Sequence, residues 1–360
     1  MPRRNGDDGS RAKRDGTQTT TKPGRVTVHD VARRAGVSQP TVSLVISGNP
    51  TARVAPATRE RVLSAVRELG YRPNVLARGL VQSRSYSLGV VIPDLRNPFF
   101  IDVVSGAERV AADEGFAVLL CNAFEVPAER HVEALRGRQV DGIVIDALGA
   151  ASLSEEALAG INVVLIDEPE NVHRGVLSDA PAAGRLAAEH LLGLGHRRVG
   201  VLGPASDAWG FRMRERGFLQ TMRAAGVTVD SEWLRRAPAT VAGGYAAMQA
   251  LLAATTAGAS AARPTAVFCL SDLMALGTLK ACAEAGVAVP RQMSVVGCDD
   301  IETARLVTPG LTTVAVPARE LGARAARMLI RLLRGETVPP AKPLPVRLVV
   351  RGSTGPVAAA

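Results

Sequence analysis

The chain has 360 residues, 47% of them hydrophobic, and a formal net charge of +9 at pH 7. This size allows more than one compact unit, and four cysteines without a CxxC spacing argue against a disulfide scaffold or a zinc module. The charge is uneven: residues 1–84 carry a net +10, so the remainder is close to neutral. A basic first quarter predicts a polyanionic partner for that quarter alone.

Residues 1–25 form a polar, Gly- and Thr-rich basic lead-in that we expect to be disordered. This lead-in contains no apolar core segment, so it does not fit a signal peptide. No apolar run in the chain reaches membrane-spanning length. The sequence therefore predicts a cytoplasmic protein without a membrane partner, and the basic first quarter predicts that it is associated with the nucleoid.

Residues 26–46 have the spacing of a helix-turn-helix. Gly36 falls where a chain leaving the first helix needs a positive φ. Ser38 is placed to cap the second helix through the amide of Thr41, because Pro40 has no N–H to offer. A small three-helix domain of another kind is the alternative interpretation. The apolar residues expected to pack the two helices together are Val28, Val31, Ala32, Ala35, Val42, Val45 and Ile46.

A third amphipathic helix is predicted over 56–69, and a short helical pattern follows over 74–81. Eight residues with an internal Gly79 are too few for a stable isolated helix. We therefore expect this hinge to become helical only when something packs against it, with Leu80 as a wedge for the DNA minor groove. A plain interdomain linker is the alternative. The buried face of the third helix is predicted to be Val62, Leu63, Val66 and Leu69.

From residue 87 onward, apolar strand-like runs alternate with amphipathic helices. This alternation predicts an α/β fold with parallel sheets covered on both faces, arranged as two doubly wound lobes. The expected strands are 88–92, 116–120, 142–145, 163–166, 199–202, 266–270, 294–296 and 346–350. The expected helices are 99–114, 128–136, 181–194, 214–225, 242–253, 273–285 and 318–333.

Several predicted strands end on a carboxylate. Ligands of parallel α/β sheets bind beyond the carboxyl ends of the strands, so these acids predict a cleft for hydroxyl- or amine-bearing ligands. Asp179 and Asp272 are interpreted as helix N-caps, whereas Asp167 and Asp299 are the better ligand candidates. The acids in question are Asp94, Asp146, Asp167, Asp179, Asp272 and Asp299.

Other residues complete or limit this prediction. Arg214 is expected to open a helix and hold a polar or anionic ligand group. Trp209, predicted in the loop before it, either stacks on a sugar or base or packs the loop, and Trp233 is expected in the core. The five histidines are scattered, and no nucleotide-binding glycine motif or nucleophile–base spacing is present. The sequence thus predicts no enzyme activity, no metal and no cofactor.

With these residues placed, the chain from about residue 26 to 356 resembles the lac repressor (LacI/GalR) family of bacterial transcription regulators. The matching stretches are VHDVA at 28–32, GVS at 36–38, TVS at 41–43, TRERV at 58–62, GYRPN at 70–74, NPFF at 97–100, VDG at 140–142, GHR at 195–197, DLMALG at 272–277, VGCDD at 296–300 and LTTV at 311–314.

The resemblance implies a repressor that binds a pseudo-palindromic operator as a homodimer or higher homo-oligomer and is controlled by a small-molecule effector. Sugars are the favoured class of effector, and nucleosides are the alternative. It implies a periplasmic-binding-protein-like effector domain over 86–356, with an N-lobe near 86–179 and 315–340 and a C-lobe near 180–314 and 341–356. The DNA-binding domain would be 26–73, the hinge and linker 74–85, and the last tail 357–360. A solute-binding protein of a transport system is the rival interpretation, but it should carry a secretion signal and no basic helix-turn-helix.

By the resemblance, Gln39, Pro40 and Leu44 take base-reading positions, although Pro40 and Leu44 replace side chains that often hydrogen-bond bases. Cys298 stands where the family often has an aromatic residue, which weakens any inference about the effector. The predicted DNA-binding set is Thr27, Val28, Ser38, Gln39, Pro40, Thr41, Ser43, Leu44, Asn49, Tyr71, Asn74, Ala77, Arg78 and Leu80. The predicted effector-binding set is Asp94, Asn97, Phe99, Phe100, Asp146, Asp167, Trp209, Arg214, Ser271 and Asp299.

Overall fold

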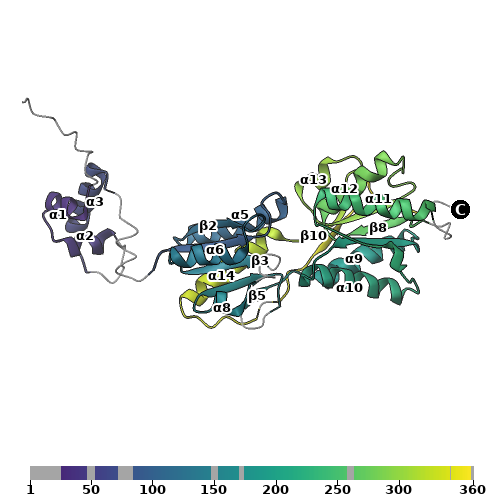
Figure 1. The fold of residues 1–360 in the computed structure, drawn as a ribbon. Coiled ribbons are helices and arrows are strands. Elements are labelled where there is room, and N and C mark those ends of the chain that lie inside the picture. Colours follow the sequence, from purple (N-terminus) through teal and green to yellow (C-terminus); the bar gives the residue numbers. More distant parts are fainter. Residues whose placement is uncertain are drawn as a thin grey trace, which may run out of the picture. The chain divides into compact units, whose positions relative to one another are not determined.

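The computed structural model describes residues 26–46, 53–71, 84–146, 153–169, 174–257, 263–340 and 342–357. The chain divides into two compact units, residues 1–81 and 82–360 (Figure 1). The predictions for the basic tail, for Asn49 and for the hinge residues Asn74, Ala77, Arg78 and Leu80 lie outside the described residues.

The first unit contains three helices, α1 (Val28–Ala35), α2 (Gln39–Ile46) and α3 (Pro56–Leu69). Thr27 begins α1 with a reciprocal cap, in which its hydroxyl accepts from the Asp30 amide and the Asp30 carboxylate accepts from the Thr27 amide. Gly36 ends this helix at φ +67°, as predicted. The fully buried residues Val31, Val42 and Val62 come one from each helix and form the centre of the core.

The second unit contains two sheets. The first has the strand order β2-β1-β3-β4-β5, and every pair in it is parallel. Helix α14 comes from late in the chain but packs on β3, β4 and α5, so it belongs to this layer (Figure 1). The elements are β1 (Ser87–Ile92), α5 (Pro98–Asp113), β2 (Ala117–Asn122), α6 (Ala128–Gly137), β3 (Gly142–Asp146), α8 (Glu155–Leu158), β4 (Asn162–Ile166), β5 (Arg174–Val176) and α14 (Ala318–Leu333).

The second sheet has the order β11-β10-β9-β8-β6-β7 and is parallel except for the antiparallel pair β10–β11. Its elements are α9 (Ala180–Gly193), β6 (Val199–Pro204), α10 (Trp209–Ala224), a 3₁₀ turn (Ser231–Trp233), β7 (Leu234–Ala237), α11 (Val241–Ala257), β8 (Ala266–Cys269), α12 (Asp272–Glu284), β9 (Ser294–Asp299), α13 (Glu302–Leu306), β10 (Thr312–Ala315) and β11 (Arg347–Val349). The predicted α/β class with parallel sheets is confirmed.

Three helix pairs in this unit are closely packed at glycine residues. A Cβ on Gly106 or Gly322 would lie within 2 Å of a backbone carbonyl oxygen of the opposite helix, where α5 meets α14. Gly184 and Gly217 make the same kind of contact between α9 and α10, and Gly244 and Gly277 between α11 and α12. Because these contacts involve backbone atoms, each helix spacing depends on the missing side chain.

Two local predictions are wrong. Helix α10 begins at Trp209, so Trp209 is not in a loop and Arg214 lies in the second turn instead of opening the helix. Asp272 is not an N-cap, because Ser271 caps α12 by accepting from the Met274 amide. Asp179 does cap α9, through the Ala182 amide at 3.1 Å. Trp233 packs partly buried against the core, and all four cysteines are free thiols.

Candidate ligand site and candidate DNA-contacting face

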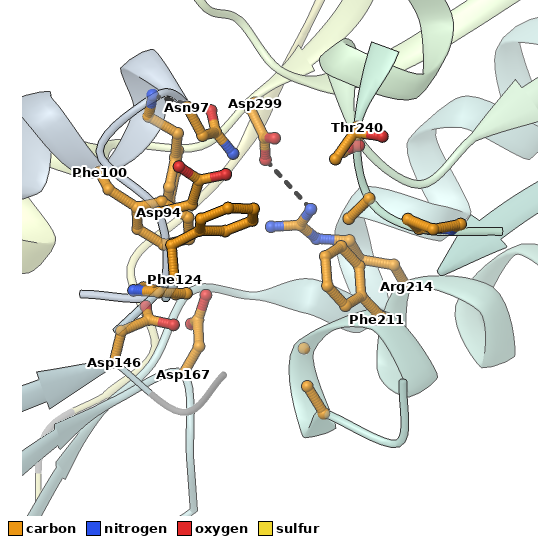
Figure 2. A pocket seen from close by; sticks show the side chains of 17 residues that line it. Asp94, Asn97, Phe100, Phe124, Asp146, Asp167, Phe211, Arg214, Thr240 and Asp299 are labelled. Carbon is orange, nitrogen blue, oxygen red and sulfur yellow. Dashed lines mark hydrogen bonds and ion pairs between the residues drawn. The ribbon is translucent and has the colours of Figure 1, made fainter. Parts of the chain in front are cut away.

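A cavity of about 270 Å³ is lined by residues that follow strands of both sheets (Figure 2). Parallel strands of a doubly wound sheet present their carboxyl ends at one edge, which is where ligands of such sheets bind. Nine of the ten predicted effector residues line it: Asp94, Asn97, Phe99, Phe100, Asp146, Asp167, Arg214, Ser271 and Asp299.

Trp209, the tenth predicted residue, is not part of this lining, because the lining residues of α10 are Gly210, Phe211 and Arg214. Eight lining residues were missed from the sequence: Pro93, Phe124, Ala208, Gly210, Phe211, Pro238, Ala239 and Thr240. The carboxylate pattern located the strand ends that carry the acids, but it contained no signal for the aromatic residues Phe124 and Phe211.

Arg214 and Asp299 form a buried ion pair across the cavity wall (Figure 2). Arg214 Nη1 donates to Asp299 Oδ1 at 3.0 Å and to the Leu270 carbonyl at 2.9 Å. The side chain of Arg214 is 5% exposed, and its Nε is buried without a hydrogen-bond partner. A buried N–H left unpaired is costly, so the guanidinium is held in this position at an energetic cost.

The electrostatics of the pair come from burial and from neighbouring acids. Burial alone lowers the pKa of Arg214, but its electrostatic interactions with Cys298, Asp299 and Asp167 outweigh this effect and raise the pKa. Burial raises the pKa of Asp299 above its usual range against the opposing effect of Arg214. The guanidinium therefore stays charged, and its main compensation is Asp299.

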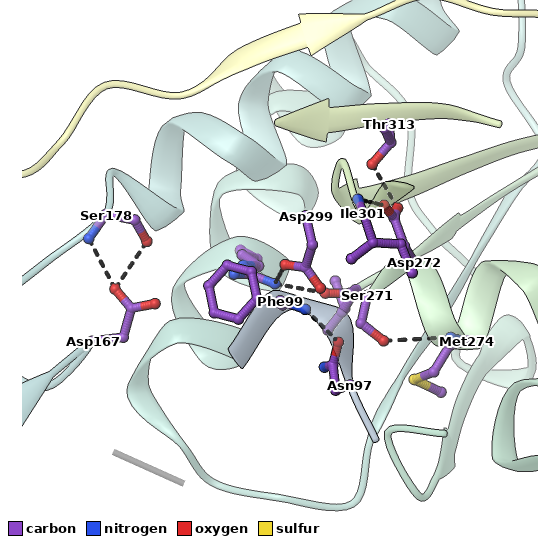
Figure 3. A network of polar contacts seen from close by, with 12 residues as sticks. Asn97, Phe99, Asp167, Ser178, Ser271, Asp272, Met274, Asp299, Ile301 and Thr313 are labelled. Carbon is purple, nitrogen blue, oxygen red and sulfur yellow. Dashed lines mark hydrogen bonds and ion pairs between the residues drawn. The ribbon is translucent and has the colours of Figure 1, made fainter. Parts of the chain in front are cut away.

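Three aspartates at or beside the cavity occupy the left-handed backbone region. Asp167 has φ +54°, Asp299 φ +132° and Asp300 φ +59°. Non-glycine residues in this region are uncommon and concentrate at functional sites. Asp167 is held there by Ser178, whose amide and hydroxyl both donate to Asp167 Oδ1, at 2.8 and 2.9 Å (Figure 3).

Asp272 does not line the cavity and has a structural role. Thr313 Oγ1 donates to one carboxylate oxygen at 2.6 Å and the Ile301 amide donates to the other at 3.0 Å (Figure 3). These bonds connect α12 to β10 and to the loop after β9. Burial is the main cause that raises the pKa of Asp272. Asp272 thereby fixes the segment that carries Asp299.

The cavity combines hydrogen-bond acceptors with aromatic rings. Its acids outnumber Arg214, the lining cation, and Phe99, Phe100, Phe124 and Phe211 supply apolar surface. Such a lining disfavours anionic ligands and suits neutral molecules that carry hydroxyl donors on a ring. Within the described part of the chain, no group of three or more histidine, cysteine, aspartate or glutamate side chains is arranged to hold a metal ion.

The first unit presents a largely exposed α2 face. Ser38, Gln39, Pro40, Ser43 and Leu44 are all exposed. Ser38 Oγ accepts from the Thr41 amide at 3.4 Å, the bond predicted from the missing N–H of Pro40, and the hydroxyls of Ser38 and Thr41 are 2.9 Å apart. Thr41 is half-buried, and Gln39 Nε2 lies 2.8 Å from His29 Nδ1.

Three further predicted DNA-binding residues also serve the fold of this unit. Thr27 caps α1, while Val28 and Tyr71 pack partly buried against the core. Among the described residues, no helix combines the length and apolarity needed to span a membrane.

Comparisons with known proteins agree over most of the chain. The family model described as bacterial regulatory proteins, lacI family, matches residues 27–74, and that of a periplasmic binding protein-like domain matches 188–354. The HTH-type transcriptional repressor PurR of Mannheimia succiniciproducens is 34% identical over 84% of this chain and 90% of its own length.

Two solved structures are similar over nearly the whole chain. The lac repressor dimer bound to operator and the anti-inducer ONPF has a TM-score of 0.79 at 29% identity, covering 92% of this chain and all of that one. The transcriptional regulator CelR in complex with cellobiose has a TM-score of 0.67 at 32% identity, covering 91% of this chain and all of that one.

Proposed function

Because the chain belongs to the lacI family of bacterial regulatory proteins, we propose that it represses transcription as a homodimer on a pseudo-palindromic operator under the control of a sugar-like effector. The chain is a DNA-binding transcription regulator with a ligand-binding domain and not an enzyme, since its relatives carry the names of repressors and regulators. The solute-binding alternative offers no account of the lacI-type segment at 27–74.

The DNA part of the proposal is supported by charge and by the face of α2. The basic excess of the chain lies in residues 1–84, where it can neutralise phosphates. Gln39 is exposed at the start of α2 and can reach base edges, whereas the exposed Leu44 suits a thymine methyl group. In the hinge, Leu80 would act as the minor-groove wedge and Ala77 would lie beside it. A protein that reads an operator in this way acts where the chromosome lies, in the cytoplasm.

The effector part rests on one observation, the buried Arg214 in a cavity whose lining also contains four aspartates and four phenylalanines. A sugar hydroxyl can accept from the Arg214 guanidinium and donate to a carboxylate, while the apolar face of the sugar ring packs on an aromatic side chain. The cellobiose complex of CelR shows that a similar fold holds a sugar. Nucleosides also combine a ring with hydroxyl groups, so they should be tested as ligands together with sugars.

Control follows if the ligand and the operator favour different arrangements of the second unit. A ligand that binds one arrangement better shifts the two hinges of the dimer, and with them the affinity for the operator. Such couplings are typically about 1–3 kcal/mol, which is roughly a 5- to 150-fold change in affinity. The ligand can release or recruit the protein, depending on which arrangement it prefers.

The test uses the purified chain, a labelled duplex of its own upstream promoter region and a scrambled duplex of the same length. Fluorescence anisotropy at modest ionic strength should give tighter binding to the promoter fragment. A sugar or nucleoside found by a thermal-shift screen should change that affinity and leave the scrambled duplex unaffected. Equal binding to both duplexes, with and without every ligand of the screen, would contradict the proposal.

A further inference from the structure

We propose that Phe124 is a specificity-determining platform at the cavity rim and that Asp94 and Arg96 are positioning residues that hold its ring. This inference rests on the proposed function, because it assigns the part of the ligand that the rim recognises. It also gives Asp94 a role different from that of a ligand acceptor, which the strand-end pattern had suggested.

The carboxylate of Asp94 is fully engaged by Arg96. The Arg96 amide donates to Asp94 Oδ1 at 2.9 Å, Nε donates to Oδ1 at 3.0 Å and Oδ2 at 3.1 Å, and Nη2 donates to Oδ2 at 2.9 Å. A carboxylate offers about four lone-pair directions, so these contacts use its acceptor capacity. Burial opposes ionisation of Asp94, but the hydrogen bonds from Arg96 outweigh it and hold its pKa below the usual value.

The guanidinium that Asp94 fixes lies on the ring of Phe124. Its central carbon is 3.5 Å from the ring centroid, the distance of a face-on cation–π contact. One face of the ring is therefore covered by Arg96, and Phe124 has only its other face and its edge to offer a ligand. Phe124 remains 48% exposed while it lines the cavity, so a large apolar surface is held open at the rim.

The two loops that carry this arrangement are connected by hydrogen bonds from two backbone amides. The Leu95 amide donates to Asn122 Oδ1 at 3.1 Å, and the Ala123 amide donates to the Ile92 carbonyl at 2.8 Å. These bonds connect the loop after β1, which carries Asp94 and Arg96, to the residues after β2 that lead into Phe124. The platform is thus fixed before any ligand arrives, which reduces the ordering cost of binding.

A fixed aromatic face selects ligands by shape. A pyranose, a furanose or a nucleobase has a flat face that can stack on Phe124, whereas an acyclic polyol has the hydroxyls without the face. Phe211 of α10 lines the same cavity and supplies an aromatic ring from the other sheet layer. The geometry therefore assigns to the rim the distinction between cyclic and open-chain ligands.

The experiment measures ligand-induced thermal shifts and dissociation constants of the full chain with cellobiose, D-ribose and adenosine as cyclic probes and sorbitol as the open-chain probe. The wild-type protein should respond to at least one cyclic probe more strongly than to sorbitol. Phe124→Leu should lower the affinity for that probe by roughly fivefold to tenfold, and Phe124→Tyr should keep the wild-type affinity. Val126→Ala, two residues further on, similarly exposed and outside the lining, is the matched control and should change nothing.

The positioning role has its own signature. Asp94→Asn and Arg96→Ala should each lower the affinity for the same probe by roughly twofold to fivefold. The double variant should bind the probe no more weakly than Arg96→Ala alone, because both residues act through one ring. Unchanged melting temperature and operator affinity separate this role from general damage to the fold. Additive losses, or full affinity in Phe124→Leu, would overturn the platform while leaving the proposed function intact. A wild-type protein that responds to none of the cyclic probes would overturn the platform, while the proposed function is judged separately by binding to the operator.

Discussion

Replacing Gly184 by alanine should destabilise the second unit, although the same change at an open helical position stabilises. A Cβ on Gly184 would lie 1.8 Å from the Arg214 carbonyl oxygen and 2.6 Å from the Phe218 amide nitrogen. Both are backbone atoms, so α9 and α10 must move apart instead of a side chain turning away. Ordinary carbon–oxygen contact requires a separation more than about 1 Å larger.

The magnitude follows from two opposing effects. Overpacking of a close contact costs about 1–3 kcal/mol, and the upper end applies where backbone meets backbone. The higher helix propensity of alanine stabilises the helix by about 1 kcal/mol relative to glycine. The net loss of about 2 kcal/mol corresponds to a melting temperature lower by about 4–8 °C for a unit of this size. Because Arg214 lies at the contact, the affinity for the effector should fall as well.

The assay is thermal unfolding of the full chain, followed by circular dichroism, with Gly193→Ala as the matched control. Gly193 is in the same helix, and a Cβ there would meet nothing within 4 Å. The control should melt at or slightly above the wild-type temperature. If Gly184→Ala melts with the control, the close contact between α9 and α10 does not constrain the fold and the reasoning is wrong.

Three further variants test other parts of the account. Thr27→Ala removes the reciprocal cap of α1 and should lower the stability of the first unit by about 1 kcal/mol in urea unfolding, more than Ser38→Ala, whose cap is a single bond of 3.4 Å; equal losses would contradict this ranking. Burial lowers the pKa of His196, so the unfolded chain takes up the proton more readily and stability should be lost as pH falls below about 6.5; His196→Gln should flatten this slope, and an unchanged slope would assign it to other groups. Leu80→Ala should weaken binding to the operator much more than binding to a scrambled duplex, and equal losses in a salt-matched titration would remove the proposed wedge role.

The sequence predicted the fold class well because buried parallel strands and amphipathic helices leave strong periodic patterns. The elements it missed lack such a pattern. Strand β7 reads LRRA at the edge of its sheet, and β10 begins with Thr312 and Thr313, which are completely buried and satisfy their hydroxyls through Thr354 and Asp272. Polar residues with buried partners cannot be distinguished from a loop before the partners are known.

The residues of the cavity also divide into those that the sequence pattern predicted and those that it did not. Acids at strand ends located it, because the position of a strand end follows from periodicity. The capping of α12 by Ser271 and the full engagement of Asp94 by Arg96 depend on side-chain directions, which spacing does not contain. Phe124 and Phe211 reach the lining through loop and helix geometry, so no motif marked them. Trp209 was predicted at the site only because the start of α10 was placed too late.

The central claim is that the cavity and the operator share one free energy of coupling. The direct measurement is the dissociation constant of the identified effector, determined by calorimetry with and without saturating operator duplex, beside that of the operator with and without saturating effector. The account predicts that both constants change by the same factor, which differs from one, and that Arg214→Met abolishes the change. An effector that binds in this cavity with one affinity, whether or not the operator is bound, would contradict the account.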